Sequence, residues 1–399
     1  MAGFALDDRQ RLDWLRLIRS ESIGPRTFRT LVNRYGGAAG ALEALPELAR
    51  QAGRSLRLCT PADAERELDL LRRRKAQLIA LGEAAYPVPL QAIDSAPPLI
   101  AVEGDGDVLK RPCVALVGSR NASAAGLKFT TLLARELGDA GFVVVSGLAR
   151  GIDTAAHQAS LSTGTIAVLA GGLDAIYPPQ NEPLLRTLRT NGAGLSEMPL
   201  GWTPRGRDFP RRNRLVSGLA LATVVVEAAR RSGSLITARF ANEQGRQVFA
   251  VPGSPLDPRA EGGNHLIREG ATLICEAAHV IEALTPMLAR DDLFAPAPIL
   301  AREDDGEDRR REPLWDELEL PDVLPAPQAE LDLGGPPPNS AAATAHRRLL
   351  DFIGPTPVAL DDLVRSNGQP AREISRLLLE LELEGLVQRH AGGALSRAF

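Results

Sequence analysis

Cysteine is scarce in this chain of 399 residues, which has three: Cys59, Cys113 and Cys275. None belongs to a CxxC pair, so the sequence offers neither a disulfide framework nor a cysteine zinc site, and we expect no metal. Cys113 and Cys275 lie in apolar runs. We therefore expect both to be buried thiols of a protein that works in a reducing cytosol.

Long apolar runs are also missing. No run reaches the roughly 20 residues that a membrane helix needs, and the N-terminus has no apolar segment typical of a secretory signal. We therefore expect a soluble, cytoplasmic protein that does not contact membranes. The length is sufficient for roughly two to four domains with a sizeable core.

The fingerprints of common catalytic folds are absent as well. The first strand of the predicted core is followed by GSRNAS at 118–123, where a dinucleotide-binding fold has G-x-G-x-x-G. Ser146, Asp153 and His157 suggest a hydrolase, but Asp153 and His157 lie four residues apart on one predicted helix, and no GxSxG elbow is found. We expect no catalytic residue and no cofactor, and we interpret His157 as structural.

Charge is distributed very unevenly along the chain. The formal net charge is −4, yet residues 201–240 contain eight Arg against Asp208 and Glu227, a local balance of +6. Residues 291–340 contain 14 Asp and Glu against four Arg, a balance of −10, and are rich in proline. The first region indicates a polyanion ligand, and the second is typical of a flexible acidic linker.

Short apolar runs alternate with helical patterns through the middle of the chain, which predicts an α/β fold: a Rossmann-like, doubly wound parallel sheet. The runs are 113–119, 142–147, 165–170, 223–228, 247–253 and 272–275. We predict four regions. The first is a helical module resembling a SAM or helix-hairpin-helix domain (1–82), and the second is the Rossmann-like core (83–285). The acidic linker (286–340) and a winged-helix module (341–399) follow.

Both flanking modules have two possible interpretations. Residues 22–36 contain a Gly-Pro turn that is similar to a helix-hairpin-helix loop, whose amides meet a DNA phosphate, but the segment could equally form a hairpin that packs on its own domain. The third predicted helix of the winged-helix module contains four glutamates. Because glutamate repels phosphates, a protein contact or a regulatory role is at least as well supported for this helix as DNA readout.

Ligands of doubly wound sheets bind at the carboxyl ends of the strands, where we expect Arg120 to hold a phosphate. Ser232-Gly233-Ser234 follows another strand and opens a helix, whose free amides suit phosphate oxygens. Phe209 lies among arginines and could stack on a base, or could serve as a hydrophobic staple for its helix. Tyr177 could likewise stack on a base or cover the edge of the sheet.

Several long motifs occur in the order found in the DNA-processing protein A (DprA/Smf) family, which the chain resembles over about 86–275. These motifs are GSRNAS, SGLARGIDTAAH, GGLDAIYPPQN, SEMPLGWTPRGRDFPRRNRLVSGLA, VVVEAARRSGSLITARFANEQGRQVFAVPG and GGNHLIREGA. The resemblance implies a protein that binds single-stranded DNA, loads the RecA recombinase during natural transformation and forms a homodimer through its Rossmann-like core. It implies no catalytic reaction and no cofactor.

The resemblance, together with the turns described above, gives a set of candidate DNA-binding residues. They are Gly118, Ser119, Arg120, Arg150, Arg205, Phe209, Arg211, Arg212, Asn213, Arg214, Ser232, Gly233 and Ser234. Residues 179–180 are Pro-Gln where the family often has a lysine, which weakens the expected cationic contact there. The alternative function is a nucleoside monophosphate hydrolase on a related fold, although the PGGxGT-type loop of such enzymes is not found.

Overall fold

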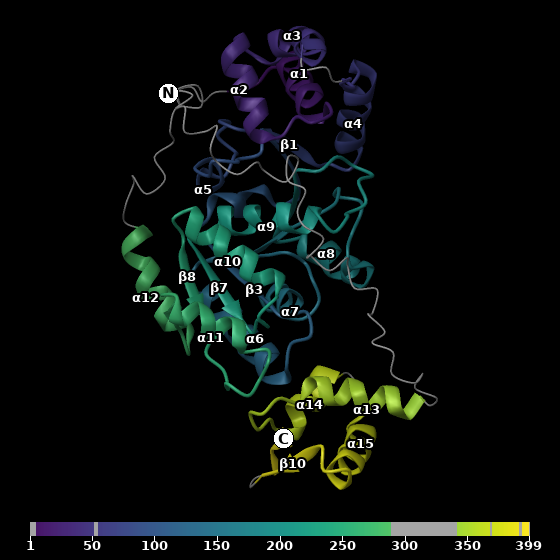
Figure 1. The fold of residues 1–399 in the computed structure, drawn as a ribbon, viewed down its shortest axis with the longest axis vertical. Helices are drawn as coiled ribbons and strands as arrows, with labels where there is room; N and C mark the ends of the chain where they lie inside the picture. The colour runs from purple at the N-terminus through teal and green to yellow at the C-terminus, as the bar shows by residue number, and fades with distance from the viewer. Residues whose placement is uncertain (1–4, 52–54, 289–340, 368, 391–392, 399) are drawn as a thin grey trace.

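The computed structural model describes residues 5–51, 55–288, 341–367, 369–390 and 393–398. Figure 1 shows three parts along the long axis: the N-terminal helices, the α/β core and the C-terminal module. The predicted fold class is confirmed in each part. Of the predicted linker 286–340, the first three residues belong to helix α12 (Ala277–Leu288), and the remainder lies outside the described residues.

Nine strands of the described chain form one sheet in the order β1-β2-β6-β5-β4-β3-β7-β8-β9. Strands β3 to β9 pair in parallel, while β2 joins both β1 and β6 in antiparallel fashion. The bounds are β1 (Gln77–Ala80), β2 (Leu99–Gly104), β3 (Cys113–Gly118), β4 (Val143–Ser146), β5 (Thr165–Val168), β6 (Ala193–Ser196), β7 (Ala222–Val226), β8 (Gln247–Ala250) and β9 (Thr272–Leu273). Because the chain continues on opposite sides of β3, the switch point of the sheet lies there.

Alternation along β3 explains why both faces of the sheet are covered. Val114 and Leu116 join the cluster that contains residues of α6, α7 and α12, whereas Ala115 and Val117 join the cluster that contains residues of α9 and α10. The remaining core helices are short: α8 contacts β5 and β6, α11 contacts β8, and α5 contacts α9. The bounds are α5 (Val88–Gln91), α6 (Ala124–Asp139), α7 (Ile152–Ala159), α8 (Glu182–Leu188), α9 (Asp208–Leu219), α10 (Gly233–Glu243) and α11 (Glu261–Arg268).

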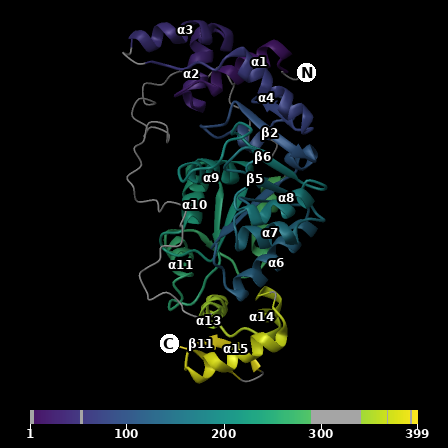
Figure 2. The ribbon, with the colours of Figure 1, turned by 90° about the vertical axis from the view of Figure 1, so that its right-hand side faces the viewer.

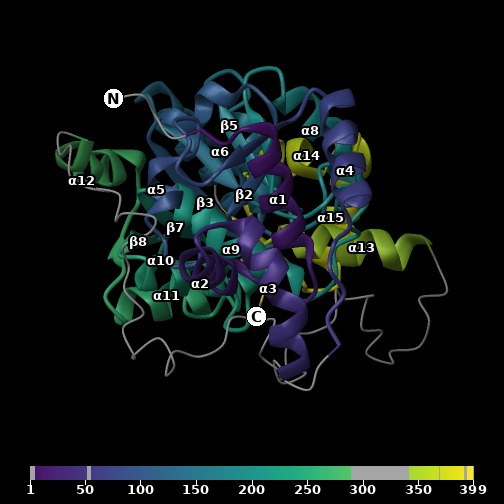
Figure 3. The ribbon, with the colours of Figure 1, turned by 90° about the horizontal axis from the view of Figure 1, so that it is seen from above.

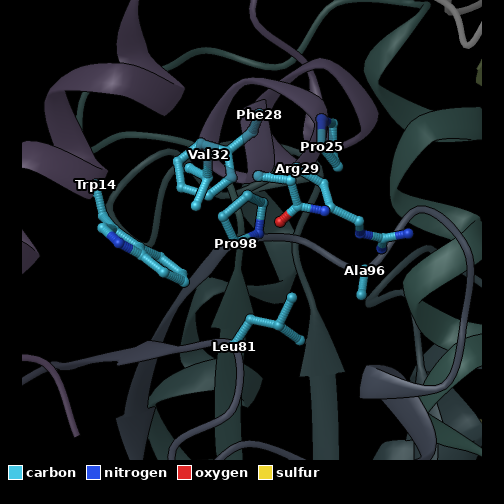
Figure 4. Close-up of a pocket in the computed structure, with 9 residues that line it drawn as sticks. Trp14, Pro25, Phe28, Arg29, Val32, Leu81, Ala96 and Pro98 are labelled. Carbon is cyan, nitrogen blue, oxygen red and sulfur yellow. The ribbon is translucent and has the colours of Figure 1, made fainter. Parts of the chain in front are cut away.

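The N-terminal helices share their hydrophobic core with the sheet, because Trp14 and Phe28 belong to the same buried cluster as strand residues. Their rings meet edge to face with centroids 5.0 Å apart, beside a small pocket that also contains Leu81 and Pro98 (Figure 4). The helices are α1 (Asp8–Arg19), α2 (Pro25–Tyr35), α3 (Ala38–Gln51) and α4 (Pro61–Arg73). Figure 3 looks down on them from above.

The Gly-Pro turn that opens α2 faces the core. Arg26 forms an ion pair with Asp94 at 2.6 Å, and Arg29 donates to the Asp94 carbonyl at 2.7 Å. These contacts attach the segment to the core region, beyond its own predicted module of residues 1–82.

The C-terminal module has three helices followed by a two-stranded hairpin, the order of a winged helix. It packs on the first turns of α6: Ala124 and Ala125 belong to its apolar cluster, and Lys128 pairs with Asp362 at 2.7 Å. Figure 2 shows the module beneath the core. Its elements are α13 (Ala341–Phe352), α14 (Leu360–Asn367), α15 (Ala371–Leu383), β10 (Val387–Arg389) and β11 (Leu395–Arg397).

One of the two thiol predictions is wrong. Cys113 is buried in β3, and burial raises the pKa of its thiol to about 12. Cys275 is exposed, because it follows β9, which lies at the border of the sheet and has two exposed residues.

Candidate functional site

The carboxyl ends of the two strands at the switch point, β3 and β7, lie side by side, since the register pairs Gly118 with Val226. Gly118 has no room for a side chain, because an added Cβ would overlap the Val226 carbonyl and the Ile152 side chain. Ser119 follows Gly118, and its carbonyl accepts a hydrogen bond from Ile152 at 3.2 Å. The turn after β3 is therefore packed tightly against its neighbours, and Arg120 is exposed at its tip.

Arg120 forms a cluster with two aromatic side chains from other parts of the chain. Its guanidinium carbon lies 5.5 Å from the centroid of the Phe209 ring, and the Tyr177 ring meets Phe209 edge to face at 5.3 Å. Phe209 lies in the first turn of α9 and is half-buried, while Tyr177 is 41% exposed. We call these three residues the arginine–aromatic cluster; it offers a cation and ring surfaces at one place.

Arg150 is exposed in a neighbouring loop that internal hydrogen bonds hold in place. The buried Asp153 carboxylate accepts from the backbone N–H groups of Gly147 and Ala149 at 3.0 and 3.2 Å. The Asn181 side-chain amide donates to the Leu148 carbonyl at 2.8 Å. Leu148 has a φ of 58°, a left-handed conformation that these bonds maintain.

Arg212 is buried beneath this loop and does not reach the surface, with an exposed fraction of 5%. It donates to the Gly147 carbonyl and, at 2.6 Å, to the Val168 carbonyl, and so joins the loop after β4 to the end of β5. Burial lowers the pKa of Arg212 to about 10, while the charge of nearby Asp153 acts in the opposite direction. The expectation that Arg212 lines a DNA path does not match this position.

Arg214 is buried even more completely, with 1% exposure. Its guanidinium forms an ion pair with Glu197 at 2.5 Å and donates to the Ser95 carbonyl at 2.6 Å. Arg211 donates to the other Glu197 oxygen at 3.2 Å and is half-buried. The charges of Arg214 and Arg211 hold the pKa of Glu197 below its usual value despite its burial. Arg214 therefore belongs to the interior, contrary to the expectation that it contacts a ligand.

The predicted turn at residues 232–234 opens α10 as expected. The Ser232 hydroxyl caps the helix by accepting from the Ser234 N–H at 3.3 Å, and the two serine hydroxyls lie 2.7 Å apart. The space around Gly233 is open, so an approaching group meets its backbone directly. Asn213 donates to the Gly233 carbonyl at 3.2 Å, which joins the turn to α9.

The first turn of α6 is already occupied by a carboxylate of the chain itself. Glu227 accepts hydrogen bonds from the Ser123 N–H at 2.8 Å and from the Ser123 hydroxyl. Its carboxyl group lies so close to Gly126 that a Cβ there would overlap it. In dinucleotide-binding folds, the helix after the first strand holds the pyrophosphate. Here Glu227 takes that place. The missing glycine fingerprint indicates that no dinucleotide binds there, but it does not predict that a carboxylate occupies the turn.

The structure confirms the interpretation of His157. The ring is fully buried, and its Nδ1 lies 2.7 Å from the Thr165 hydroxyl. Since that hydroxyl donates to the Val144 carbonyl at 2.7 Å, Nδ1 carries the proton and donates to Thr165. Burial lowers the pKa of His157 to about 3, so the ring is neutral at physiological pH. The Ser146 hydroxyl donates to the Leu116 carbonyl at 2.6 Å.

Arg205 lies before α9, is exposed and stacks on a tryptophan that is not among the predicted site residues. Its guanidinium carbon is 5.2 Å from the ring centroid of Trp202. An arginine three residues after a tryptophan in a loop is a weak signal by itself, because sequence spacing does not fix contacts outside regular elements.

No group of three or more His, Cys, Asp or Glu side chains is placed to hold a metal ion within the described residues. In the same part of the chain, every helix is too short or too polar to cross a membrane.

The fold and the site define a Rossmann-like protein that presents arginine and aromatic side chains at the switch point of its sheet. A family model described as DNA recombination-mediator protein A matches residues 77–285. Models described as the DprA-like N-terminal HHH domain and the DprA winged helix domain match residues 8–69 and 334–393. The chain belongs to the DNA-processing protein A (DprA/Smf) family.

Individual relatives agree with this assignment. Protein Smf of Synechocystis sp. is 31% identical over 399 residues, which cover 95% of this chain and 96% of that protein. Protein Smf of Escherichia coli is 37% identical over 338 residues, which cover 82% and 79% of the two chains. The X-ray structure of DNA processing protein A from Streptococcus pneumoniae shares 35% identity with a TM-score of 0.52, covering 65% of this chain and 98% of that one.

Proposed function

We propose that this chain binds single-stranded DNA in the cytoplasm and acts as a recombination mediator that loads RecA on DNA taken up during natural transformation. Membership of a family described as DNA recombination mediators supports this role. We further propose that it works as a homodimer through its α/β core and that it catalyses no reaction of its own.

The arginine–aromatic cluster is the observation that carries the proposal. A cation binds a phosphate, and an aromatic ring stacks on an unpaired base. Arg120, Phe209 and Tyr177 offer both within about the length of one nucleotide. A duplex keeps its bases stacked inside, so it can use the cation but not the rings. The cluster therefore favours single-stranded over double-stranded DNA without strong sequence choice.

The remaining candidate residues divide into direct contacts and supports. We propose that Arg120, Arg150, Arg205, Phe209 and the turn at 232–234 meet the strand, and that Gly118 and Ser119 let the turn after β3 approach it closely. Arg211, Arg212, Asn213 and Arg214 have partners within the protein and hold the contact-bearing segments in position. The cation that polyanion binding requires is thus supplied by the exposed arginines.

The hydrolase alternative receives less support. In doubly wound nucleotide-binding folds the helix after the first strand receives phosphate, and here Glu227 occupies the first turn of α6 with its own negative charge. A free nucleotide approaching there would meet a carboxylate instead of free amides.

Fluorescence anisotropy with a labelled oligo-dT and a blunt duplex of equal length, across a salt series, tests DNA binding. We expect tighter binding of the single strand, with affinity falling as salt rises. Equal affinity for the two DNAs would contradict the proposal. RecA loading is tested separately, by the rate of RecA ATP hydrolysis on single strands coated with a single-strand-binding protein, and dimerisation by sedimentation equilibrium.

A further inference from the structure

The loop 199–207 between β6 and α9 carries a second pairing of an arginine with an aromatic ring. Arg205 is exposed and lies over the half-buried Trp202 ring at 5.2 Å. The pairing repeats the chemistry of Arg120 over Phe209, with a larger ring. It lies in a loop whose backbone the protein fixes at several points, so the ring is held in place before any ligand arrives.

Asp208 is the first of these fixed points. This buried residue is the first of α9, and one of its carboxylate oxygens accepts from the Trp202 indole N–H at 2.9 Å and from the Arg205 backbone N–H at 2.8 Å. The single polar atom of the indole is therefore used inside the protein. The ring has no other polar group to satisfy, so a ring face can be offered to a base.

Segment 171–177 after β5 supplies the second set of fixed points. The Gly172 N–H donates to the Trp202 carbonyl at 3.0 Å, and the Asp174 carboxylate accepts from the Gly201 N–H at 2.8 Å. The same segment ends in Tyr177, which contacts Phe209. Both pairings are thus attached to the same two supports: the first turn of α9, through Asp208 and Phe209, and segment 171–177.

Because the two pairings share these supports, we propose that Trp202 and Arg205 form a second nucleotide contact on the same strand path. The Trp202 ring stacks on a base, and Arg205 neutralises the adjoining phosphate. This inference rests on the proposed binding of single-stranded DNA. It assigns to Asp208 the role of a positioning residue, which orients the Trp202 indole through its hydrogen bond and does not contact the DNA strand.

Tryptophan emission reports this contact directly, because stacking on a base quenches the indole. The chain has three tryptophans: Trp14 in the N-terminal helices, Trp202, and Trp315 outside the described residues. The difference in quenching between the wild type and Trp202→Phe isolates the signal of Trp202. We expect oligo-dT to quench the wild type, and an abasic deoxyribose-phosphate oligomer of equal length to leave the Trp202 signal unchanged.

Affinity measurements on full-length variants complete the test. Trp202→Ala should weaken oligo-dT binding roughly 5- to 150-fold, the range for loss of one stacking aromatic, whereas Trp202→Phe should retain most of the affinity. Arg205→Ala should lower the salt slope by up to about 0.7. Asp208→Asn should reduce the Trp202 quenching more than it changes the salt slope, because the indole N–H loses its charged acceptor while the Arg205 charge is retained.

The outcomes separate this inference from the proposed function. Suppose that the wild type binds oligo-dT and Phe209→Ala weakens binding, but Trp202→Ala binds like the wild type and the Trp202 emission of the wild type does not change. Only the second contact is then refuted. If the wild type does not bind oligo-dT, the proposed function itself fails. Melting curves of each variant check that a lost signal does not come from unfolding.

Discussion

Five arginines lie between residues 205 and 214, and the fold divides them according to position. Arg205 and Arg207, before α9, are exposed, whereas Arg212 and Arg214, within α9, are buried, and Arg211 is half-buried between the two groups. Helix α9 lies between the sheet on one side and α5 with residues near Ser95 on the other, so its arginines meet protein on both sides.

This division matters because a buried charge must be compensated and an exposed one need not be. The effective cost of moving an ion out of water is several kcal/mol, so a buried guanidinium persists only with partners. Glu197 supplies the counter-charge for Arg214, while two carbonyls and the nearby Asp153 supply the partners of Arg212. Exposed Arg120 has an aromatic face beside it, and that leaves the guanidinium edge for a ligand.

The largest effect is expected from Arg214→Leu. The change leaves the buried Glu197 carboxylate beside the half-buried Arg211 at 3.2 Å and without the Arg214 charge, so the free energy of unfolding should fall by about 3–5 kcal/mol. Urea titration at neutral pH measures the fall. The double variant Arg214→Leu/Glu197→Leu removes both charges and should recover part of the loss. Wild-type stability in Arg214→Leu alone would contradict the assignment of this pair to the scaffold.

A smaller effect is expected from Arg212→Met, which removes the charge-assisted bonds to the Gly147 and Val168 carbonyls. Stability should fall by roughly 1.5–3 kcal/mol, the scale of hydrogen bonds to a charged group. Affinity for oligo-dT should fall too, since the loop that presents Arg150 loosens, but the salt slope should stay the same because a buried cation releases no counterions.

Arg205→Met is the matched control for Arg212→Met, since it removes an exposed arginine from the same stretch. It should lower the salt slope and leave the urea midpoint unchanged. If Arg212→Met lowered the slope as well, Arg212 would have to reach the DNA in the complex, and the separation of the two groups would fail.

The sequence predicted the architecture more completely than the site, and the reason lies in what each depends on. Strands β3 and β7 are apolar, valine-containing runs whose burial follows from composition, and both appear where predicted. Strand β6 has the sequence Ala-Gly-Leu-Ser, which carries no strand signal, and its place between β5 and β2 comes from tertiary pairing. Regular elements leave a local pattern, and strand pairing at a distance does not.

For the site, the sequence indicates which residues have suitable chemistry, but it does not indicate which of them are exposed. Arg120 and Phe209 are 89 positions apart in the chain, and each lies in an unusual local context that marks it as a candidate. Their contact at 5.5 Å depends on the turn after β3 meeting the first turn of α9. Likewise, the partner that draws Arg214 inside is Glu197, 17 residues earlier, and no local pattern links the two.

Arg120→Ala tests the exposed arginine that lies over the Phe209 ring. We expect oligo-dT binding to weaken by roughly 1–3 kcal/mol, the scale of one lost charge-assisted contact, with an unchanged melting temperature because the side chain is exposed. Arg120→Lys keeps the charge but loses the flat guanidinium, so it should recover only part of the affinity. A lower melting temperature with full affinity would instead assign Arg120 to the scaffold.

The smallest effect is expected at Arg230, one of two exposed arginines in the turn between β7 and α10. Its ion pair with Glu261 is long, at 3.5 Å, and both side chains are mostly exposed, at 79% and 52%, so the pair should add almost nothing to stability. If the strand passes the turn at 232–234, Arg230→Ala should lower the salt slope by up to about 0.7 without changing the melting temperature. Glu261→Ala is the matched variant: it frees the same arginine and should leave affinity unchanged or slightly higher at low salt. If the salt slope of Arg230→Ala were unchanged, the DNA strand would not reach this turn. Its contacts would then be limited to the residues around Phe209 and Trp202.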